Sequence, residues 1–166
     1  GNLERDLNSI KLLGIRNKSA ISLFETFETL SKYYKNWCLR QFNKIIKSQN
    51  YTNLKVGVLG LTYKKNTNSI KNSPSIFLIN KIKKITKNIL VHDPILNEDD
   101  KSKYGIGIKS AKELIKKSNI IFVMLDIDEY RELNLDKIIK NKKIIIDPFS
   151  VFKFFKNNSI QIYRIK

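Results

Sequence analysis

The chain has 166 residues, of which 42% are hydrophobic, and it carries a formal net charge of +17 with a single cysteine. This length suits one domain with a hydrophobic core plus a helical extension, and the composition excludes disordered and fibrous classes. No apolar run reaches the roughly 18 residues that a membrane-spanning helix requires. One cysteine excludes an intrachain disulfide, so we expect a reducing, cytoplasmic location.

The positive charge consists almost entirely of lysine, and the lysines are distributed along the whole chain rather than in one segment. Lysine, asparagine and isoleucine are abundant together, as AT-rich codons produce. We therefore interpret the charge as a compositional bias on a solvated surface, and a nucleic-acid partner is not expected. A diffuse positive field would still attract an anionic small molecule such as a diphosphate.

Residues 1–50 have a helical pattern. A first helix is expected over about 3–13, with Gly14 as its C-cap. Ser19 then suits the N-cap of a long helix over 19–49, in which apolar residues recur every three or four positions. Such a helix is about 45 Å long, more than a domain of this size covers. Part of its apolar stripe should therefore contact another chain or another domain.

Residues 54–166 show a different pattern, in which short β-branched apolar runs alternate with helical segments. Strands are predicted at 55–61, 89–91, 120–125, 143–146 and 160–165, and helices at 74–84, 110–117 and 135–140. Ser110 and Glu113 have the capping-box spacing at the start of the second of these helices. The inner runs are continuously apolar, as in parallel strands that are covered on both faces. This alternation predicts βαβ units and an α/β, Rossmann-like parallel sheet with flanking helices.

The loop after the first predicted strand carries the candidate binding residues. It runs from Gly60 to Pro74 at the carboxyl end of a strand, where open α/β sheets bind their ligands. Ser73 suits the N-cap of the next helix, whose N–H groups and dipole favour a phosphate. Lys64 and Lys71 would add positive charge. The alternative is an ordinary polar loop with solvated lysines, because the strand lacks a full dinucleotide motif.

The segment Val56 to Asn80 resembles the opening of the C-terminal domain of the UDP-glucose/GDP-mannose dehydrogenase family. The shared pattern is a strand and a glycine, then an aromatic residue and lysine, a threonine, a basic residue and Ser-Pro. These stand here as Tyr63-Lys64, Thr67, Lys71 and Ser73-Pro74. Further similarity at residues 3–7, 91–94 and 118–125, and in the long helix, extends the resemblance over nearly the whole chain.

The resemblance implies roles for residues of this loop. Lys64 would contact the sugar nucleotide, and Thr67 and Ser73 would belong to the same substrate loop. Lys71 stands where the family has an arginine near substrate and cofactor, and it keeps the charge but loses the planar guanidinium. Asp6 corresponds to an aspartate that takes part in the family's chemistry.

The resemblance also implies a homodimer through the helix 19–49 and NAD as the family's cofactor, bound through a domain that is absent here. We expect no NAD bound to this chain alone. The family's catalytic cysteine would precede Leu3, where Asn2 stands, and an amide cannot hold the aldehyde intermediate as a thiol does. The family's Asp-Gly-Arg-Asn, whose arginine contacts the nucleotide, is replaced by residues 147–150, Asp-Pro-Phe-Ser. The chain alone is therefore predicted to be inactive.

Other candidate residues have simpler interpretations. Cys38 lies mid-helix without a neighbouring base, which predicts a buried structural thiol. His92 is the only histidine, so a His-rich metal site is excluded and no metal is expected. Asp93 is interpreted as part of a turn after a strand. An acidic run at 126–129 could contact a ribose, but it is interpreted as a solvated loop.

The sequence thus predicts the UDP-sugar-binding portion of a nucleotide-sugar dehydrogenase-like protein. Residues 1–50 would form a helical dimerisation segment, and residues 54–166 a Rossmann-like domain. A sugar nucleotide and a second copy are the expected partners, without a membrane. The alternative is a degenerate, non-catalytic dimerisation module that binds no small molecule, which the altered loop and the replaced arginine motif favour.

Overall fold

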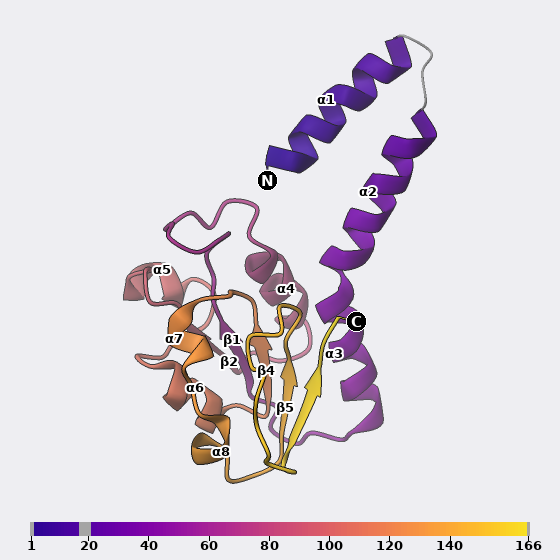
Figure 1. The fold of residues 1–166 in the computed structure, drawn as a ribbon. Coiled ribbons are helices and arrows are strands. Elements are labelled where there is room, and N and C mark those ends of the chain that lie inside the picture. The colour runs from indigo at the N-terminus through magenta and orange to yellow at the C-terminus, as the bar shows by residue number, and fades with distance from the viewer. Residues whose placement is uncertain (1, 17–20, 166) are drawn as a thin grey trace. The chain divides into compact units, whose positions relative to one another are not determined.

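The computed structural model describes residues 2–16 and 21–165. The chain divides into two compact units, residues 1–37 and residues 38–166, and each is described by itself (Figure 1). Within the described residues, no helix is long and apolar enough to cross a membrane.

The first unit consists of two helices, α1 (Asn2–Arg16) and α2 (Ile21–Lys35), which pack against each other. Lys11 Nζ of α1 lies 3.2 Å from Glu28 Oε2 of α2. The prediction that α1 ends at Gly14 is wrong, because the helix continues through it to Arg16. The predicted cap Ser19 lies outside the described residues. Both helices expose large apolar side chains: Ile10, Leu12, Leu13, Ile15, Leu23, Phe27, Leu30, Tyr33 and Tyr34.

The single long helix predicted over 19–49 is interrupted at Asn36. Here α2 has ended, and α3 spans Trp37–Ser48. Asn36 donates both its backbone N–H (3.2 Å) and its side-chain Nδ2 (2.8 Å) to the carbonyl of Lys32. An asparagine amide that competes for a helix carbonyl disfavours regular continuation of the helix. The boundary between the two compact units, after residue 37, lies next to this interruption.

The second unit is a parallel six-stranded sheet with helices on its faces, as predicted (Figure 1). The strands are β1 (Val56–Leu59), β2 (Ile89–His92), β3 (Ile106–Gly107), β4 (Ile120–Val123), β5 (Lys143–Ile146) and β6 (Ile160–Tyr163). Their order is β3-β2-β1-β4-β5-β6, the doubly wound order of dinucleotide-binding folds. All strands are parallel, so their carboxyl ends share one edge of the sheet.

Five helices connect these strands: α4 (Pro74–Ile82), α5 (Glu98–Ser102), α6 (Ala111–Lys117), α7 (Asp128–Arg131) and α8 (Leu135–Ile138). The predicted caps are present, since Ser73 Oγ accepts from the N–H of Ser75 and Ser110 Oγ from that of Glu113, each at 3.2 Å. The helix α3 also contacts the sheet: the ring centroids of Phe42 in α3 and Phe122 in β4 lie 5.7 Å apart.

Two glycines of β1 and its exit permit close approach of the chain. A Cβ at Gly57 would lie 2.4 Å from Leu114 Cδ2 of α6, so this helix sits directly on the strand. Gly60 has φ +91°, and a Cβ there would lie 2.3 Å from Leu125 Cβ after β4. Gly60 therefore turns the chain from β1 across the end of β4 in a conformation that other residues rarely adopt.

Replacing Gly60 with alanine is expected to lower the free energy of unfolding by roughly 2–4 kcal/mol, since it adds both backbone strain and a clash. Urea unfolding followed by circular dichroism measures the change. Asn66 also has a positive φ, of 59°, but Asn66→Gly should change stability by less than about 0.5 kcal/mol. Equal stability of Gly60→Ala and wild type would contradict this role of Gly60.

Candidate functional site

The candidate site lies at the carboxyl edge of the sheet, where β1 has β2 on one side and β4 on the other. After β2 the chain continues to β3 on one side of the sheet, and after β4 it continues to β5 on the other side. Open α/β folds bind ligands outside such a reversal of strand order. The loop 61–73 begins here, directly after Gly60 and before α4.

Asp93 fixes the base of this loop. Its carboxylate is 1% exposed. Oδ2 accepts from the N–H groups of Leu61 (2.8 Å) and Thr62 (3.0 Å) and from the Thr62 hydroxyl (3.2 Å). Oδ1 accepts from the N–H groups of Ile95 (3.0 Å) and Leu96 (3.4 Å). The residue interpreted as part of a turn thus joins the loop after β1 to the loop after β2.

Ser73 closes the loop at its other end. Its hydroxyl donates to the carbonyl of Leu61 at 2.6 Å while it caps α4. Between these ends, the N–H of Tyr63 donates to the carbonyl of Ser69 at 2.8 Å, and Thr67 Oγ accepts from the N–H of Ser69 at 3.2 Å. The loop is therefore a hydrogen-bonded unit that projects from a fixed base.

The predicted substrate residues occupy different environments in this loop. Lys64 and Lys71 are exposed and Thr67 is half-buried, so these three side chains can reach a ligand. Ser73 is 3% exposed, and its hydroxyl already serves two structural hydrogen bonds. Asp6, the predicted catalytic residue, is exposed on α1 and belongs to the first unit, so the site built here consists of second-unit residues alone.

The N-terminus of α4 offers fewer phosphate donors than the sequence suggests. Pro74, at the first helical position, has no N–H, and the N–H of Ser75 already donates to Ser73 Oγ. The lysines of the loop, rather than the helix terminus, are therefore the cationic groups of this site.

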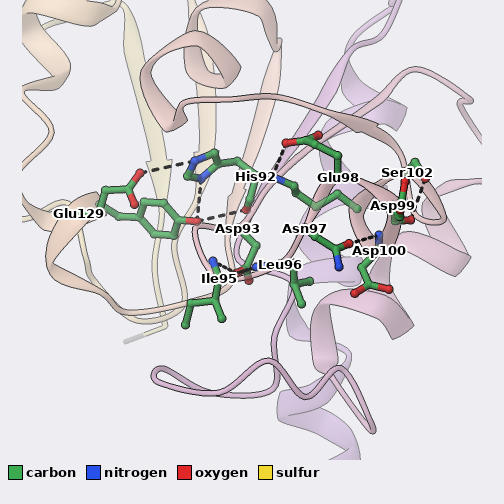
Figure 2. A network of polar contacts seen from close by, with 12 residues as sticks. His92, Asp93, Ile95, Leu96, Asn97, Glu98, Asp99, Asp100, Ser102 and Glu129 are labelled. Atoms are coloured by element: carbon green, nitrogen blue, oxygen red, sulfur yellow. Dashed lines mark hydrogen bonds and ion pairs between the residues drawn. The ribbon is translucent and has the colours of Figure 1, made fainter.

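A second polar network lies beside the base of the loop (Figure 2). His92 and Tyr130 are buried, with His92 Nδ1 3.1 Å from the Tyr130 hydroxyl, which also lies 3.2 Å from the carbonyl oxygen of His92. On the other side of the imidazole, Nε2 lies 3.5 Å from Glu129 Oε1. The carbonyl of His92 also accepts from the N–H of Gly60 at 2.8 Å, so the network and the loop share one oxygen.

Burial is the largest cause of the pKa shifts of His92 and Tyr130. It lowers the pKa of His92 from its usual value, against the opposing effect of the Glu129 carboxylate. Burial also raises the pKa of the Tyr130 hydroxyl well above its usual value. A neutral imidazole and a neutral phenol suit a structural role, which agrees with the interpretation of His92 as a strand-end residue.

The acidic run after β4 is partly paired. Arg131 makes two contacts of 2.5 Å with the carboxylate of Asp126, and Glu129 faces His92. Only Asp128 of this run fits the interpretation as a solvated side chain without qualification, since it is exposed at the start of α7.

Residues 147–150, Asp-Pro-Phe-Ser, begin with a buried carboxylate. Asp147 is 0% exposed, and its Oδ2 accepts from the N–H of Phe152 at 2.9 Å. Burial, followed by the nearby charge of Asp147, raises the pKa of the Cys38 thiol to about 12. Cys38 is thus an unreactive buried thiol, as predicted. Arg164, which sequence reasoning missed, donates through Nη2 to the carbonyl of Phe152.

The acidic side chain that would meet the ribose of a dinucleotide such as NAD is engaged within the protein. In dinucleotide-binding sheets, an acidic side chain at the end of the second strand binds a ribose hydroxyl. Asp93 holds that position here, but both of its oxygens are engaged by the protein's own donors. Within the described part of the chain, no cluster of three or more His, Cys, Asp or Glu side chains could hold a metal.

The doubly wound sheet and the loop after β1 define a Rossmann-like domain with exposed lysines at its carboxyl edge. Comparison with known proteins makes this specific. Residues 57–154 match the UDP binding domain of the UDP-glucose/GDP-mannose dehydrogenase family. The match covers more than half of the chain, and the chain belongs to this family.

Individual relatives are longer than this chain. A UDP-N-acetyl-D-mannosamine dehydrogenase from Pyrococcus horikoshii is 27% identical over 100 residues, which are 59% of this chain and 22% of that protein. Among solved structures, a UDP-glucose dehydrogenase from Pyrobaculum islandicum has a TM-score of 0.76 at 17% identity, over 96% of this chain and 35% of its own. A GDP-mannose dehydrogenase from Pseudomonas aeruginosa has a TM-score of 0.72 at 14% identity, over 98% of this chain and 38% of its own. These structures share the fold.

Replacing Asp93 with asparagine should lower the free energy of unfolding by roughly 2–4 kcal/mol, because an amide N–H₂ then faces N–H donors in a buried position. Hydrogen exchange at Leu61 and Thr62 should accelerate as well. Asp99→Asn, at an exposed position of α5, should alter stability by less than about 0.5 kcal/mol. Unchanged exchange at both amides in Asp93→Asn would show that this carboxylate does not hold the loop.

His92 gives a pH dependence of stability with a defined sign. In the unfolded chain the imidazole titrates near its ordinary pKa of about 6.5, and in the folded chain its pKa is lower. As pH falls through about 6.5 the unfolded state therefore binds more protons, and stability decreases until the folded pKa is reached. Urea unfolding between about pH 7.5 and 5.5 should show a weaker decrease in His92→Gln than in wild type. If the stability of His92→Gln and of wild type fell equally with pH, His92 would not be the cause of the decrease.

Proposed function

We propose that this chain supplies the sugar-nucleotide-binding portion of a nucleotide-sugar dehydrogenase-like protein, and that the diphosphate of a UDP-sugar binds over the loop 61–73. The proposal rests mainly on one observation: two exposed lysines, Lys64 and Lys71, project from a loop whose base is held by Asp93 and Ser73. Membership of a family whose domain is named for UDP binding supports it.

The proposed roles follow from charge and position. Lys64 follows the fixed base of the loop by two residues, so its ammonium group can meet a phosphate with little backbone rearrangement. Lys71 lies near the start of α4 and would neutralise the second phosphate or face a cofactor held elsewhere. Thr67 would donate its hydroxyl proton to the ligand. We assign Ser73 a positioning role, because its hydroxyl already holds Leu61 and α4.

We propose that this chain alone does not oxidise the sugar. Asn2 stands where the family's thiol is expected, and the only thiol, Cys38, is buried with a pKa near 12. NAD and the residues that bind it would come from outside these 166 residues. The single unreactive cysteine is in keeping with a reducing, cytoplasmic compartment.

A homodimer through the helical segment 19–49, and more broadly through the first unit, is the second part of the proposal. The exposed apolar side chains of α1 and α2, including Leu13, Phe27 and Leu30, are the kind of surface that a second copy covers. If no nucleotide binds, this dimerisation would itself be the function, as a structural module. The replacement of the family's arginine motif by residues 147–150 favours that alternative.

Calorimetric titration with UDP, UDP-glucose and GDP-mannose tests the binding site. We expect saturable binding by the wild-type chain and a loss of roughly 10- to 100-fold in affinity for Lys64→Ala, since one charge-assisted contact is removed. Lys65→Ala is the matched control, because Lys65 is the adjacent exposed lysine of the same loop. Equal affinity of Lys64→Ala and wild type would refute the assignment of Lys64.

Light scattering on the same samples separates the two candidate functions. A dimer that gives no heat with any nucleotide would favour the structural module. A monomer that binds a nucleotide would favour the binding domain without dimerisation through α1 and α2.

A further inference from the structure

The parallel topology gathers lysines that are dispersed in the sequence. Because all strands are parallel, each connection returns the chain to the amino edge of the sheet, opposite the candidate site, before the next strand begins (Figure 1). The six residues that precede β1, β2, β4, β5 and β6 contain no acidic residue and the lysines Lys55, Lys83, Lys84, Lys87, Lys116, Lys117, Lys137, Lys140, Lys142 and Lys156. We name these lysines the basic edge. The entry to the short edge strand β3 differs, because Lys103 there is paired with Asp100 at 2.8 Å. The even spread of lysine along the sequence therefore does not mean an even spread in space.

Hydrogen bonds place these segments side by side. The N–H of Val56 donates to the carbonyl of Asn88 at 3.0 Å, and the N–H of Asn119 donates to that of Lys55 at 2.8 Å. The N–H of Ile144 donates to the carbonyl of Asn119 at 3.1 Å. With strands about 4.8 Å apart, the entries to β2, β1, β4 and β5 span about 14 Å. Exposed lysines stand at all four entries: Lys87, Lys55, Lys116 and Lys142.

Two carboxylates lie against the basic edge and offset part of its positive charge. Glu113 is paired with Lys117 at 2.5 Å, and the carboxylate of Asp136 accepts from the backbone N–H of Lys156 at 3.0 and 3.1 Å. Lys143 is buried among these segments and donates to the carbonyls of Lys116 and Ser118. Its pKa is lowered by burial and then by the charge of Lys55, which agrees with a positive field at this edge.

Large apolar side chains stand exposed within the same segments. Ile85, before β2, is 48% exposed, and Phe154, before β6, is 94% exposed. Phe154 lies between Lys153 and Lys156 in sequence. The N–H of Lys156 is bonded to Asp136 of α8, so Phe154 stands within about 7 Å of chain from that anchor. An almost fully exposed phenylalanine leaves apolar surface in water, which is unfavourable unless another surface covers it.

We propose that the basic edge attaches the protein to an anionic lipid surface. Clustered lysines near such a surface each add to its attraction, and an exposed aromatic side chain inserts at the boundary between headgroups and acyl chains. A nucleic acid would use the lysines but gives Ile85 no role. The expectation of no membrane partner rested on the lack of a spanning segment, and peripheral attachment needs none. The carboxyl edge, with the loop 61–73, lies at the opposite end of the strands and stays open to a nucleotide.

Sedimentation with sucrose-loaded vesicles tests the charge requirement. The full chain should bind vesicles containing phosphatidylserine and not vesicles of phosphatidylcholine alone, and binding should weaken with added salt. The triple variant Lys55→Glu, Lys87→Glu and Lys142→Glu should lose about 100-fold in partitioning. The control, Lys64→Glu, Lys65→Glu and Lys71→Glu, makes the same change in net charge at the carboxyl edge and should lose far less. Equal losses in the two triples would overturn the proposal, because binding would then follow net charge alone.

A pair of phenylalanine variants tests the apolar requirement. Phe154→Ala should weaken binding to the anionic vesicles about tenfold, whereas Phe149→Ala should leave it unchanged, although Phe149 is 50% exposed in the same connection between β5 and β6. Both should fold as wild type by circular dichroism, since neither side chain is buried. An unchanged Phe154→Ala, or tighter binding to a labelled 20-nucleotide RNA than to the vesicles, would overturn the proposal in favour of a polyanion surface.

Discussion

The carboxylate of Asp93 is the constraint on which the site depends. A buried carboxylate destabilises a folded protein unless its oxygens accept hydrogen bonds. Here they accept from five donors in the loops after β1 and β2. The same bonds that make its burial tolerable hold the start of the loop 61–73. Ser73 secures the other end, so the exposed lysines project from a fixed base without any ligand to organise it.

This arrangement explains why a dinucleotide-type sheet need not bind a dinucleotide. The fold provides an acidic residue at the end of the second strand, where it can meet a ribose. In this chain that residue, Asp93, is buried, and its hydrogen bonds stabilise the protein's own loops. The exposed charged groups of the first loop are lysines, which suit phosphates rather than a ribose hydroxyl.

The sequence predicted the sheet well, because continuous apolar runs such as 120–125 are typical of strands that are buried on both faces. Ser73 and Ser110 were found as caps because a cap depends on local sequence. The break at Asn36 was missed, since it arises from one side chain competing for one carbonyl. The strand β3 has two residues and no apolar run that could reveal it. Asp93 was interpreted as a turn residue and Tyr130 was missed, because their burial depends on contacts far along the chain. Lys64, Thr67, Lys71 and Asp6 remain predictions as functional residues.

The way in which the loop after β1 is held also bears on how the protein is made. The exit of β1 is shaped by His92 and Asp93 on one side and by Leu125 on the other, all of which are synthesised later. During translation, the first loop of the domain therefore cannot take its final form until the strand β4 has emerged from the ribosome. The candidate binding loop is among the first segments of the domain to be synthesised, yet its native contacts require residues that follow β2 and β4.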